Sequence, residues 1–470
     1  MPPPILKELM DQFSNPFPRL RVLFLTSAVC LSSFVVHADL WSTGYYPGWE
    51  QGSLPASNID FTALTHVIHF SVIPNTDGTL NSSDNGVTVA NSTDIVTRAH
   101  AAGKKVLICV GGAGSESNFL AATSIVNLPV FISNLTNFMV ARDYDGVDID
   151  WEPLPASDAG QFTNLVNGLR FALNSFPEHK LLTVAAGAYP PYGDPPIAEY
   201  LMYAALQGQF DQINIMTYDM SGPWEGWVTW FNSPIYDGGY RLPSSGDLVP
   251  SVDGAVSNFI NNGVTPGKLG IGIAFYGYVW TGGTGTPVAS ITQPRQSWIN
   301  APTATAYRYT DIMADYYQSN LYHWDASAQS AYLSVTNANP ANSDFISYDD
   351  QRTCQSKVSY ARNHGLGGVT IWELAQDHQN GRPDPLLQAL KQALATPSLI
   401  TIQFTNQSID LSFTSLPLGS YRVQWTDNLT NSVWNTLIVT NVSGSGGPLQ
   451  VTDTNSFNQS QRFYRVQTPP

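Results

Sequence analysis

The chain is poor in cysteine and in charge, and it has few long apolar runs. Its 470 residues include three cysteines, and Cys30 lies in the N-terminal leader described below, so Cys109 and Cys354 do not suggest a disulfide framework. Charged residues make up 12% of the chain, and 36 acidic against 21 basic side chains give a net charge of −15. This balance excludes binding to nucleic acid or to an anionic membrane by charge attraction, whereas a neutral polysaccharide is indifferent to it.

The one long apolar run lies near the N-terminus. Residues 22–36 follow Arg19 and Arg21 and end in a small-x-Ala cleavage pattern at residues 36–38. The run is short for a transmembrane helix, and no other segment is long and apolar enough to span a membrane. The sequence therefore predicts a signal peptide over residues 1–38 and a secreted, extracellular protein without a membrane anchor.

Aromatic residues, in contrast, are plentiful. They also make up 12% of the chain, with 12 Trp and 22 Tyr. This abundance suits both a large core and the aromatic-lined cleft of a secreted enzyme.

The strongest chemical signal is the stretch at residues 145–152, Asp-Gly-Val-Asp-Ile-Asp-Trp-Glu. Asp148, Asp150 and Glu152 are two positions apart, so on a strand their carboxyls share one face while the apolar residues between them face the other way. Bulky residues at the alternate positions argue against a calcium loop. Three neighbouring carboxyls repel one another, and burial disfavours their charged forms. At least one is therefore expected to hold its proton at neutral pH, as a general acid must.

From residue 39 the pattern alternates between strand and helix, which predicts a parallel sheet. Strands are expected at residues 41–46, 64–72, 105–110, 145–152, 181–186, 212–218, 268–276 and 367–372, and helices at 87–102, 116–141 and 158–176. Eight such units predict a TIM (β/α)8 barrel over residues 39–396, with its site at the C-terminal ends of the strands. Residues 277–350 interrupt the repeat and are interpreted as an insertion subdomain, the alternative being a long structural loop.

The pattern changes after residue 396. Residues 397–470 contain short alternating runs at 399–404, 409–413, 421–425, 437–442, 449–452 and 463–466, with turn-forming residues between them. They predict a small all-β domain, a β-sandwich. Trp425 and Trp434 would either bind carbohydrate or lie in the core of this domain, and their size and apolarity favour the core.

The acidic stretch, read as D-G-x-D-x-D-x-E, resembles the motif of glycoside hydrolase family 18, the chitinase family. Met216-Thr217-Tyr218-Asp219 is similar to the family's M-x-Y-D, and further motifs in the family's order cover most of residues 41–395. The resemblance, to bacterial chitinases with a small α+β insertion, implies retaining, substrate-assisted hydrolysis of the β-1,4 linkages of chitin and chito-oligosaccharides. It also implies a monomer that needs no metal and no other cofactor.

The resemblance supplies a role for each catalytic residue. Glu152 would protonate the glycosidic oxygen, while the N-acetyl carbonyl of the bound sugar attacks its own anomeric carbon. Asp150 would orient the acetamido group and stabilise its positive charge, and Asp148 would share a proton with Asp150. Tyr218 would hydrogen-bond the acetamido oxygen. Further substrate contacts are implied for Tyr45, Tyr46, Gly112, Met216, Asp219, Trp224, Tyr276 and Trp372.

Two positions depart from the family pattern. The family's S-x-G-G appears as Cys109-Val110-Gly111-Gly112, and a thiol is a weaker donor than the hydroxyl that normally holds the innermost acid together with a tyrosine matching Tyr45. The family's F-Y-G-R ends here in Tyr278, so an arginine contact to sugar is expected to be lost. Neither change removes the acid at Glu152.

Two other functions remain open at this point. An endo-β-N-acetylglucosaminidase that acts on glycans or cell walls would use the same motif, although Trp372 and the insertion favour chitin. A non-hydrolytic chitin-binding lectin would use the same fold, but such lectins typically lack the acid that this chain keeps at Glu152.

Overall fold

The computed structural model describes residues 40–188, 197–284, 291–379 and 381–395 of the chain. Of the C-terminal part it describes residues 401–404, 408–414, 420–428, 433–441, 448–454 and 462–467. The predicted signal peptide at residues 1–38 lies outside these ranges. Within them, no helix combines the length and the apolarity that crossing a bilayer requires.

Eight parallel strands form a closed barrel, which confirms the predicted TIM fold. They are β1 (Trp41–Pro47), β2 (His66–Pro74), β4 (Lys105–Gly112), β5 (Gly146–Trp151), β6 (Leu181–Gly187), β7 (Gln212–Met216), β8 (Leu269–Ala274) and β14 (Gly368–Trp372). The ring closes because β1 pairs with both β14 and β2. A short strand, β3 (Leu80–Asn81), pairs antiparallel with the end of β2.

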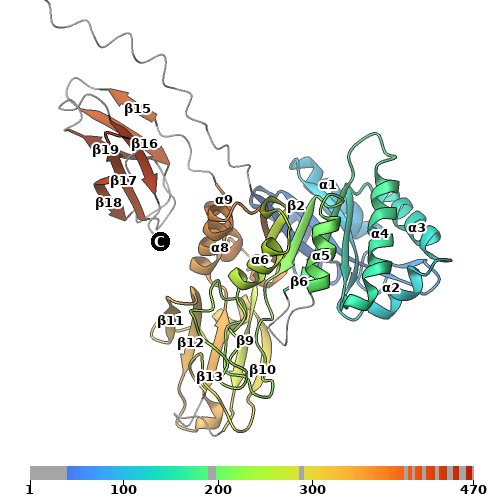
Figure 1. Cartoon of the computed structure of the whole chain (residues 1–470), viewed down its shortest axis with the longest axis horizontal. Coiled ribbons are helices and arrows are strands. Elements are labelled where there is room, and N and C mark those ends of the chain that lie inside the picture. The colour runs from blue at the N-terminus through green and yellow to red at the C-terminus, as the bar shows by residue number, and fades with distance from the viewer. Residues whose placement is uncertain are drawn as a thin grey trace, which may run out of the picture. The chain divides into compact units, whose positions relative to one another are not determined.

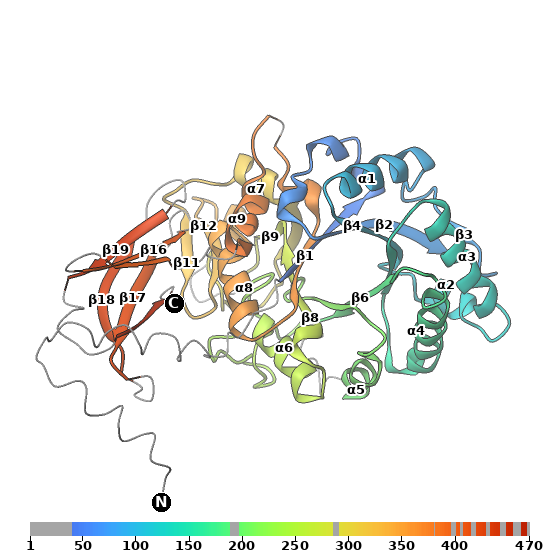
Figure 2. The same cartoon turned by 90° about the horizontal axis from the view of Figure 1, so that it is seen from above.

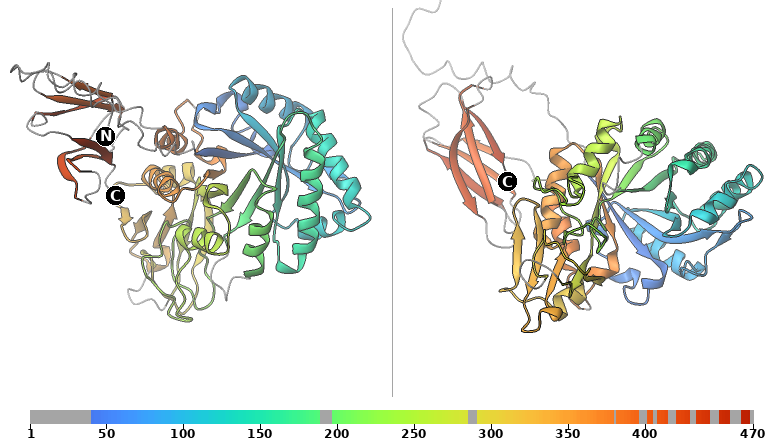
Figure 3. Two further views of the ribbon diagram at one scale, coloured as in Figure 1. Left: turned by 45° about the horizontal axis from the view of Figure 1, so that its top comes forward. Right: turned by 60° about the horizontal axis from the view of Figure 1, so that its bottom comes forward.

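Helices lie around the outside of the strands, as Figure 2 shows and as Figure 3 repeats from two further directions. They are α1 (Val89–Ala101), α2 (Glu116–Ala122), α3 (Leu128–Ala141), α4 (Ala159–Leu173), α5 (Ile197–Leu206), α6 (Val252–Asn261), α8 (Gln351–Asn363) and α9 (Pro385–Leu394). The single helix expected at residues 116–141 is in fact the pair α2 and α3. The second helix begins at Leu128, and Pro129 suits its first turn because proline has no N–H to donate.

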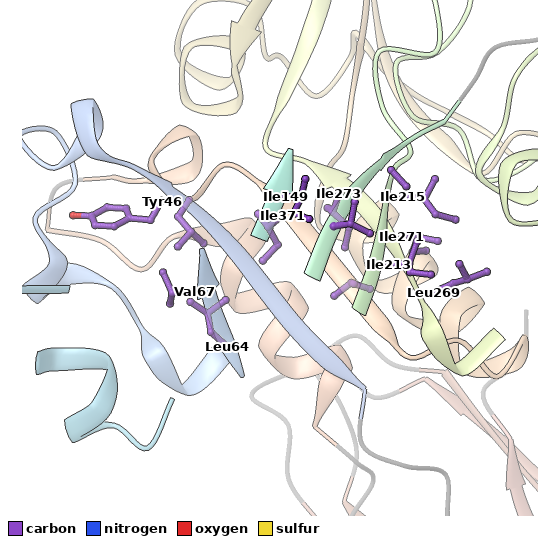
Figure 4. Close-up of a cluster of buried hydrophobic side chains, with 14 of the residues drawn as sticks. Tyr46, Leu64, Val67, Ile149, Ile213, Ile215, Leu269, Ile271, Ile273 and Ile371 are labelled. Atoms are coloured by element: carbon purple, nitrogen blue, oxygen red, sulfur yellow. The ribbon is translucent and has the colours of Figure 1, made fainter. Parts of the chain in front are cut away.

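The main core lies between the strands and the helices. Every second residue of a barrel strand points outward into it, such as Val147, Ile149 and Trp151 of β5. Figure 4 shows Ile213 and Ile215 of β7 in the same layer, with further isoleucines of β8 and β14. Burying one such side chain contributes about 1.5–3 kcal/mol. The outward residues therefore fix the register of each strand, and the residues between them must point into the barrel.

A second sheet is inserted between β8 and β14. It contains β9 (Tyr276–Thr281), β10 (Thr303–Arg308), β11 (Tyr322–Asp325), β12 (Ser330–Val335) and β13 (Asp344–Tyr348), in the order β10-β9-β13-β12-β11, with α7 (Tyr309–Asp315) after β10. All its pairings are antiparallel. Figure 1 shows β9, β10, β12 and β13 side by side. The segment predicted at residues 277–350 is thus a sheet with a helix rather than an irregular loop.

The C-terminal part consists of two three-stranded antiparallel sheets. One contains β15 (Thr401–Phe404), β16 (Ile409–Thr414) and β19 (Pro448–Asp453), and the other β17 (Ser420–Thr426), β18 (Asn435–Asn441) and β20 (Phe463–Gln467). Their shared core joins Phe413 of one sheet to Tyr421 of the other, with ring centroids 5.3 Å apart. The strands agree with the predicted runs to within two residues at every end.

The two tryptophans of this part do not belong to its apolar cluster, contrary to the position favoured from the sequence. Both are half-buried. The guanidinium carbon of Arg462 lies 3.8 Å from the Trp425 ring centroid, and that of Arg465 lies 4.2 Å from the Trp434 ring centroid. Each ring is therefore covered by a cation on one face.

A chain truncated after Thr396 is expected to fold. It is also expected to hydrolyse soluble chito-oligosaccharides, the activity that the family resemblance implies. The physical reason is that the barrel is complete at α9, which ends at Leu394, and that the β-sandwich has an apolar cluster of its own. The measurements are thermal unfolding and hydrolysis rate beside the full chain. An insoluble or inactive product would show that the two parts fold as one unit.

Candidate active site

Three carboxyls follow one another along the inner face of β5 and its end. The side chain of Asp148 is fully buried, Asp150 is 3% exposed, and Glu152, just beyond the strand, is half-buried. Their order follows from the alternation of β5, whose apolar residues are held in the outer core. The strand thus presents a column of acids that runs from the barrel interior toward its C-terminal end.

Asp148, the innermost acid, is held by donors from β1 across the barrel and from β4 and β6, the two strands that flank β5. The Tyr45 hydroxyl donates to its Oδ2 at 2.9 Å, and the Thr183 hydroxyl donates to its Oδ1 at 2.5 Å. Cys109 lies opposite Asp148 on β4, and its thiol also hydrogen-bonds this carboxyl. Burial raises the pKa of Asp148 to about 6, and the three hydrogen bonds oppose that rise.

Asp150 and Glu152 form a coupled pair. Burial raises the pKa of Asp150 well above its usual range, and the charges of Glu152 and Asp148 raise it further. Burial also raises the pKa of Glu152, while its hydrogen bond with Asp150 lowers it and the charge of Asp219 raises it. Asp150 Oδ1 is buried and has no hydrogen-bond partner among the described residues. This pair therefore keeps a proton to higher pH than isolated carboxyls do, and Asp150 presents an unpaired acceptor.

The glycines at the end of β4 make room for this column. Gly111 has φ +109°, and a Cβ there would lie 2.0 Å from the carbonyl oxygen of Asp150. Gly112 has φ +121°, and a Cβ there would lie 2.8 Å from Cζ of Phe70. Both positions thus need glycine for backbone conformation and for space. Gly112, a predicted contact residue, thus contributes to the site by having no side chain, which leaves room for the Phe70 ring.

Ser115, which the sequence reasoning missed, holds the backbone beneath the acids. Its hydroxyl donates to the carbonyl of Asp150 at 3.3 Å and accepts from the N–H of Glu152 at 3.4 Å. Its only sequence signal is its position just after the two glycines.

The segment after β7 brings a second group of polar side chains. Tyr218 is 9% exposed and packs with Met216, Tyr276 and Trp372. The hydroxyls of Tyr276 and Tyr278 both donate to Asp219 Oδ1, at 2.7 and 2.9 Å. Tyr278, which replaces the arginine of the family pattern, therefore contacts Asp219. It donates a hydrogen bond as a neutral hydroxyl, whereas an arginine would donate as a cation.

Aromatic rings border the site on two sides. Trp372, at the end of β14, packs on Tyr45 at 5.5 Å and on Phe70 at 4.9 Å between ring centroids. Trp49, which is 50% exposed, packs on Phe70 in turn at 5.7 Å. The sequence reasoning did not single out Phe70 or Trp49, although Phe70 lies on the same face of β2 as Ile68, another member of this cluster.

The tryptophans after β7 divide into one exposed ring and two buried ones. Trp224 is 39% exposed, and Trp227 packs against it at 5.0 Å between centroids. Trp227 and Trp230 are 3% and 0% exposed and belong to a separate apolar cluster. Trp224 alone of the three offers a substantial surface to a ligand.

The predicted substrate contact at Tyr46 is wrong. Tyr45 points into the barrel, so its neighbour Tyr46 must point outward, where it is fully buried in the main core. Its hydroxyl donates to the carbonyl of Leu54, and Figure 4 shows it in the outer layer near Val67. The structure brings together the other predicted residues on or just after β1, β4, β5 and β7, at the start of β9 and at the end of β14, while Trp224 belongs to the loop after β7.

Replacing Cys109 is expected to shift the acid limb of the pH–rate profile. A hydroxyl donates more strongly than a thiol, so Cys109→Ser should lower the pKa of Asp148 below its present value of about 6 and move the acid limb to lower pH. Cys109→Ala removes a donor and should move it to higher pH. The thiol is fully buried and should resist bulky alkylating reagents. Unchanged profiles in both variants would show that Cys109 does not act on Asp148.

The donor set of the site does not resemble a metal centre. Within the described ranges, no three His, Cys, Asp or Glu side chains are grouped so that they could hold a metal ion. The carboxyls of β5 instead interact with one another and with hydroxyl and thiol donors.

Comparison with known proteins gives a consistent result. The model of the family "Glycosyl hydrolases family 18" matches residues 42–377. Chitinase A1 of Niallia circulans is 30% identical over 359 residues, 70% of this chain but 47% of the relative, so this chain spans about half of that protein. Chitinase 1 of Aphanocladium album is 28% identical over 381 residues, 75% of this chain and 83% of the relative. A solved family 18 N-acetylglucosaminidase from Paenibacillus barengoltzii superposes with a TM-score of 0.62 at 25% identity, covering 75% of this chain and 99% of the other.

Proposed function

The chain belongs to family 18 of the glycosyl hydrolases, and from this premise we propose that it is a secreted chitinase. It hydrolyses the β-1,4 linkages between N-acetylglucosamine units of chitin and chito-oligosaccharides, with retention of the anomeric configuration. The sugar's own acetamido group acts as the nucleophile, and Glu152 is the general acid and base.

The observation that carries this proposal is the unpaired, buried Oδ1 of Asp150 beside Glu152. A buried acceptor without a donor costs about 1–3 kcal/mol. The N–H of an acetamido group at this position would satisfy it. The site thus suits an N-acetylated sugar, because the acetamido N–H supplies the donor that this acceptor lacks.

Glu152 has the properties that its role demands. Burial raises its pKa, so the carboxyl holds its proton to higher pH than a free glutamate does and can give that proton to the leaving glycosidic oxygen. As that bond breaks, the acetamido oxygen bonds to the anomeric carbon and forms an oxazolinium ion. Water then attacks the same carbon, the bond between that carbon and the acetamido oxygen breaks so that the neutral acetamide is restored, and the attacking water passes a proton to Glu152. No proton or atom is left over at the end of the cycle.

Asp150, Asp148 and Tyr218 act on the acetamido group and its charge. Asp150 orients the N–H and stabilises the positive charge that develops on it, and Asp148 shares the Asp150 proton. Tyr218, whose pKa burial raises well above its usual range, remains a neutral donor to the acetamido oxygen. Trp372 offers an apolar face on which a pyranose ring can stack, and Trp224 offers another one.

A second candidate is a glycosidase that acts on N-acetylglucosamine linkages in glycans rather than in chitin. The similarity to a solved N-acetylglucosaminidase favours it. The same acids and the same acetamido acceptor would serve this reaction. A non-hydrolytic lectin is disfavoured by the retained acid Glu152.

The test is a product profile from chitohexaose with resolution of the anomers. The proposal expects shorter N-acetylglucosamine oligomers released first as the β-anomer, and no cleavage of a matched glucoside without N-acetyl groups. Release of sugar from a high-mannose glycopeptide but not from colloidal chitin would favour the second candidate. Binding to chitin without turnover would favour the lectin.

A further inference from the structure

The segment that carries Tyr218 and Asp219 is held from behind by Asn232. Asp219 has φ +55°, a left-handed conformation that costs a side-chain-bearing residue energy unless its surroundings maintain it. The N–H of Asp219 donates to Asn232 Oδ1 at 2.8 Å, and the N–H of Met220 donates to the Asn232 carbonyl at 3.0 Å. Asn232 itself is 2% exposed. One buried residue, through its side-chain amide oxygen and its backbone carbonyl, thus fixes the turn after Tyr218.

Ser233, the next residue, fixes the other end of the segment. Its hydroxyl donates to the carbonyl of Thr217 and accepts from the ammonium of Lys357. That ammonium also donates to Asp349 Oδ2 at 2.5 Å and to the Gly272 carbonyl at 3.4 Å. Ser233, Lys357 and Asp349 are 1%, 0% and 2% exposed. A buried ion pair therefore anchors the serine that holds the backbone just before Tyr218.

Thr217 links this anchored backbone to β8, on which the Tyr218 ring packs. Its hydroxyl donates to the carbonyl of Gly272 at 3.0 Å and accepts from the N–H of Gly272 at 2.7 Å. A Cβ on Gly272 would lie 2.7 Å from Cε1 of Tyr218, so the ring rests directly on this glycine of β8. Any shift of Thr217 would move the ring relative to the acids of β5.

The inserted sheet supplies two of the anchors. The N–H of Asn232 donates to the Ser347 hydroxyl of β13 at 2.7 Å, and Asp349 follows the same strand. Asp349 also accepts from the N–H of Ala274 at 3.2 Å. The restraint on the segment after β7 therefore comes from β8, α8 and the inserted sheet together.

Stability alone does not call for a lysine at this position. Burying an ion pair costs desolvation free energy that its attraction often fails to recover, and apolar replacements of whole pairs are often neutral or stabilising. What the ammonium provides is a directed hydrogen bond to Ser233, and through it a fixed position for the Thr217 carbonyl. These contacts therefore serve to position the backbone at Thr217.

We propose that Asn232, Ser233 and the Lys357–Asp349 pair form a clamp that positions Tyr218 and Asp219 against Asp150 and Glu152. The inference rests on the proposed function, because it takes Tyr218 to act on the acetamido oxygen. The four clamp residues are positioning residues, since the segment Thr217–Met220 lies between them and the reacting atoms. The clamp acts on the transition state more than on ground-state binding.

The first test is Ser233→Ala, assayed on chitohexaose. A displacement of about 1 Å in a catalytic group can cost roughly 100-fold in rate, so we expect kcat to fall by roughly 10- to 100-fold with KM changed by less than about threefold. Ser233→Thr, which keeps the hydroxyl, should restore most of kcat. The matched control is Ser92→Ala in α1. Ser92 is also fully buried, and its hydroxyl accepts a hydrogen bond from the guanidinium of Arg142 at 2.9 Å. This variant should unfold at a lower temperature without a change in kcat.

The second test replaces the ion pair as a unit. Lys357→Met with Asp349→Asn removes both buried charges at similar volume, so the protein should fold with little change in melting temperature while kcat falls as in Ser233→Ala. If Ser233→Ala and the paired variant keep kcat within twofold of the parent, the clamp does not position the site, and the proposal is overturned.

The third test asks whether the clamp acts through Tyr218. In a Tyr218→Phe background, Ser233→Ala should lower kcat by less than about twofold, because the hydroxyl that it positions is already gone. Independent, multiplicative losses would overturn the inference even if each single loss is large. Failure of the proposed function is distinguishable, since the parent enzyme itself would then leave chitohexaose intact.

Discussion

Glu152→Gln is expected to lower turnover of chito-oligosaccharides by roughly 10²- to 10⁴-fold, the usual contribution of a general acid. The change removes the only proton that the proposal delivers to the leaving oxygen, and it alters the volume of the side chain little. Binding of chitohexaose, measured by calorimetry on the inactive variant, should stay close to that of the parent enzyme. A large loss in kcat without a loss in affinity is the signature of an interaction made in the transition state.

The pH dependence gives an independent check of this assignment. Glu152 works in its protonated form, and its pKa is raised, so the rate of the parent enzyme should fall as pH rises through that raised pKa. The variant should lack this alkaline limb, because glutamine does not titrate. Residual activity within tenfold of the parent enzyme, or an unchanged alkaline limb, would remove Glu152 from its role.

Asp150→Asn is expected to produce the second large loss, on the order of 10²- to 10³-fold in kcat, similar to the loss of one donor to a developing charge. The amide keeps the shape of the side chain but cannot carry the negative charge that, in the proposed mechanism, stabilises the oxazolinium ion. Tyr218→Phe, which removes one hydroxyl from the other side of the acetamido group, should reduce kcat by a similar factor. Rates are to be compared on chitohexaose at pH values from 4 to 9.

The control for this prediction is a change that leaves the acetamido group untouched. Trp224→Ala removes an exposed ring and should raise KM for long oligomers more than it lowers kcat. If Asp150→Asn behaved in the same way as Trp224→Ala, Asp150 would be a binding residue only.

The carboxyl column was predictable because it depends on a period of two within one strand. Val147, Ile149 and Trp151 are apolar and must enter the outer core, so Asp148 and Asp150 have only the inside of the barrel left. The same reasoning locates the other barrel strands and most strands of the C-terminal sandwich. Patterns of this kind need no knowledge of distant residues, and so the sequence alone carries them.

Tyr46 shows where that reasoning fails. Both faces of a TIM-barrel strand are buried, and β1 carries two adjacent tyrosines just before its last residue, Pro47, so hydrophobicity does not say which of them points inward. The choice is made by packing, since Tyr45 reaches Asp148 and Tyr46 reaches Leu54. The motif at residues 145–152 predicts where the acids lie, but it does not predict which residues of the other strands surround them.

Contacts between distant parts of the chain could not be predicted from the sequence either. Lys357 and Ser233 are 124 positions apart, and neither belongs to a recognisable motif. Tyr278 departs from the family pattern, and its contact with Asp219 depends on how β9 leaves the barrel. Pairings of this kind are set by the folded arrangement, and a single sequence carries no trace of them.

The inserted sheet begins with side chains that already belong to the site, and this limits how the enzyme can be shortened or recombined. Tyr276 and Tyr278 open β9 and both contact Asp219, while Ser347 and Asp349 close the segment and restrain the loop after β7. Excising residues 277–350 to obtain a minimal barrel would remove three of these four contacts at once. A protein engineer who wishes to exchange this sheet between relatives must therefore transplant both of its ends together with the loop at residues 217–233. The turn at residues 336–342, in contrast, is exposed and open to insertion.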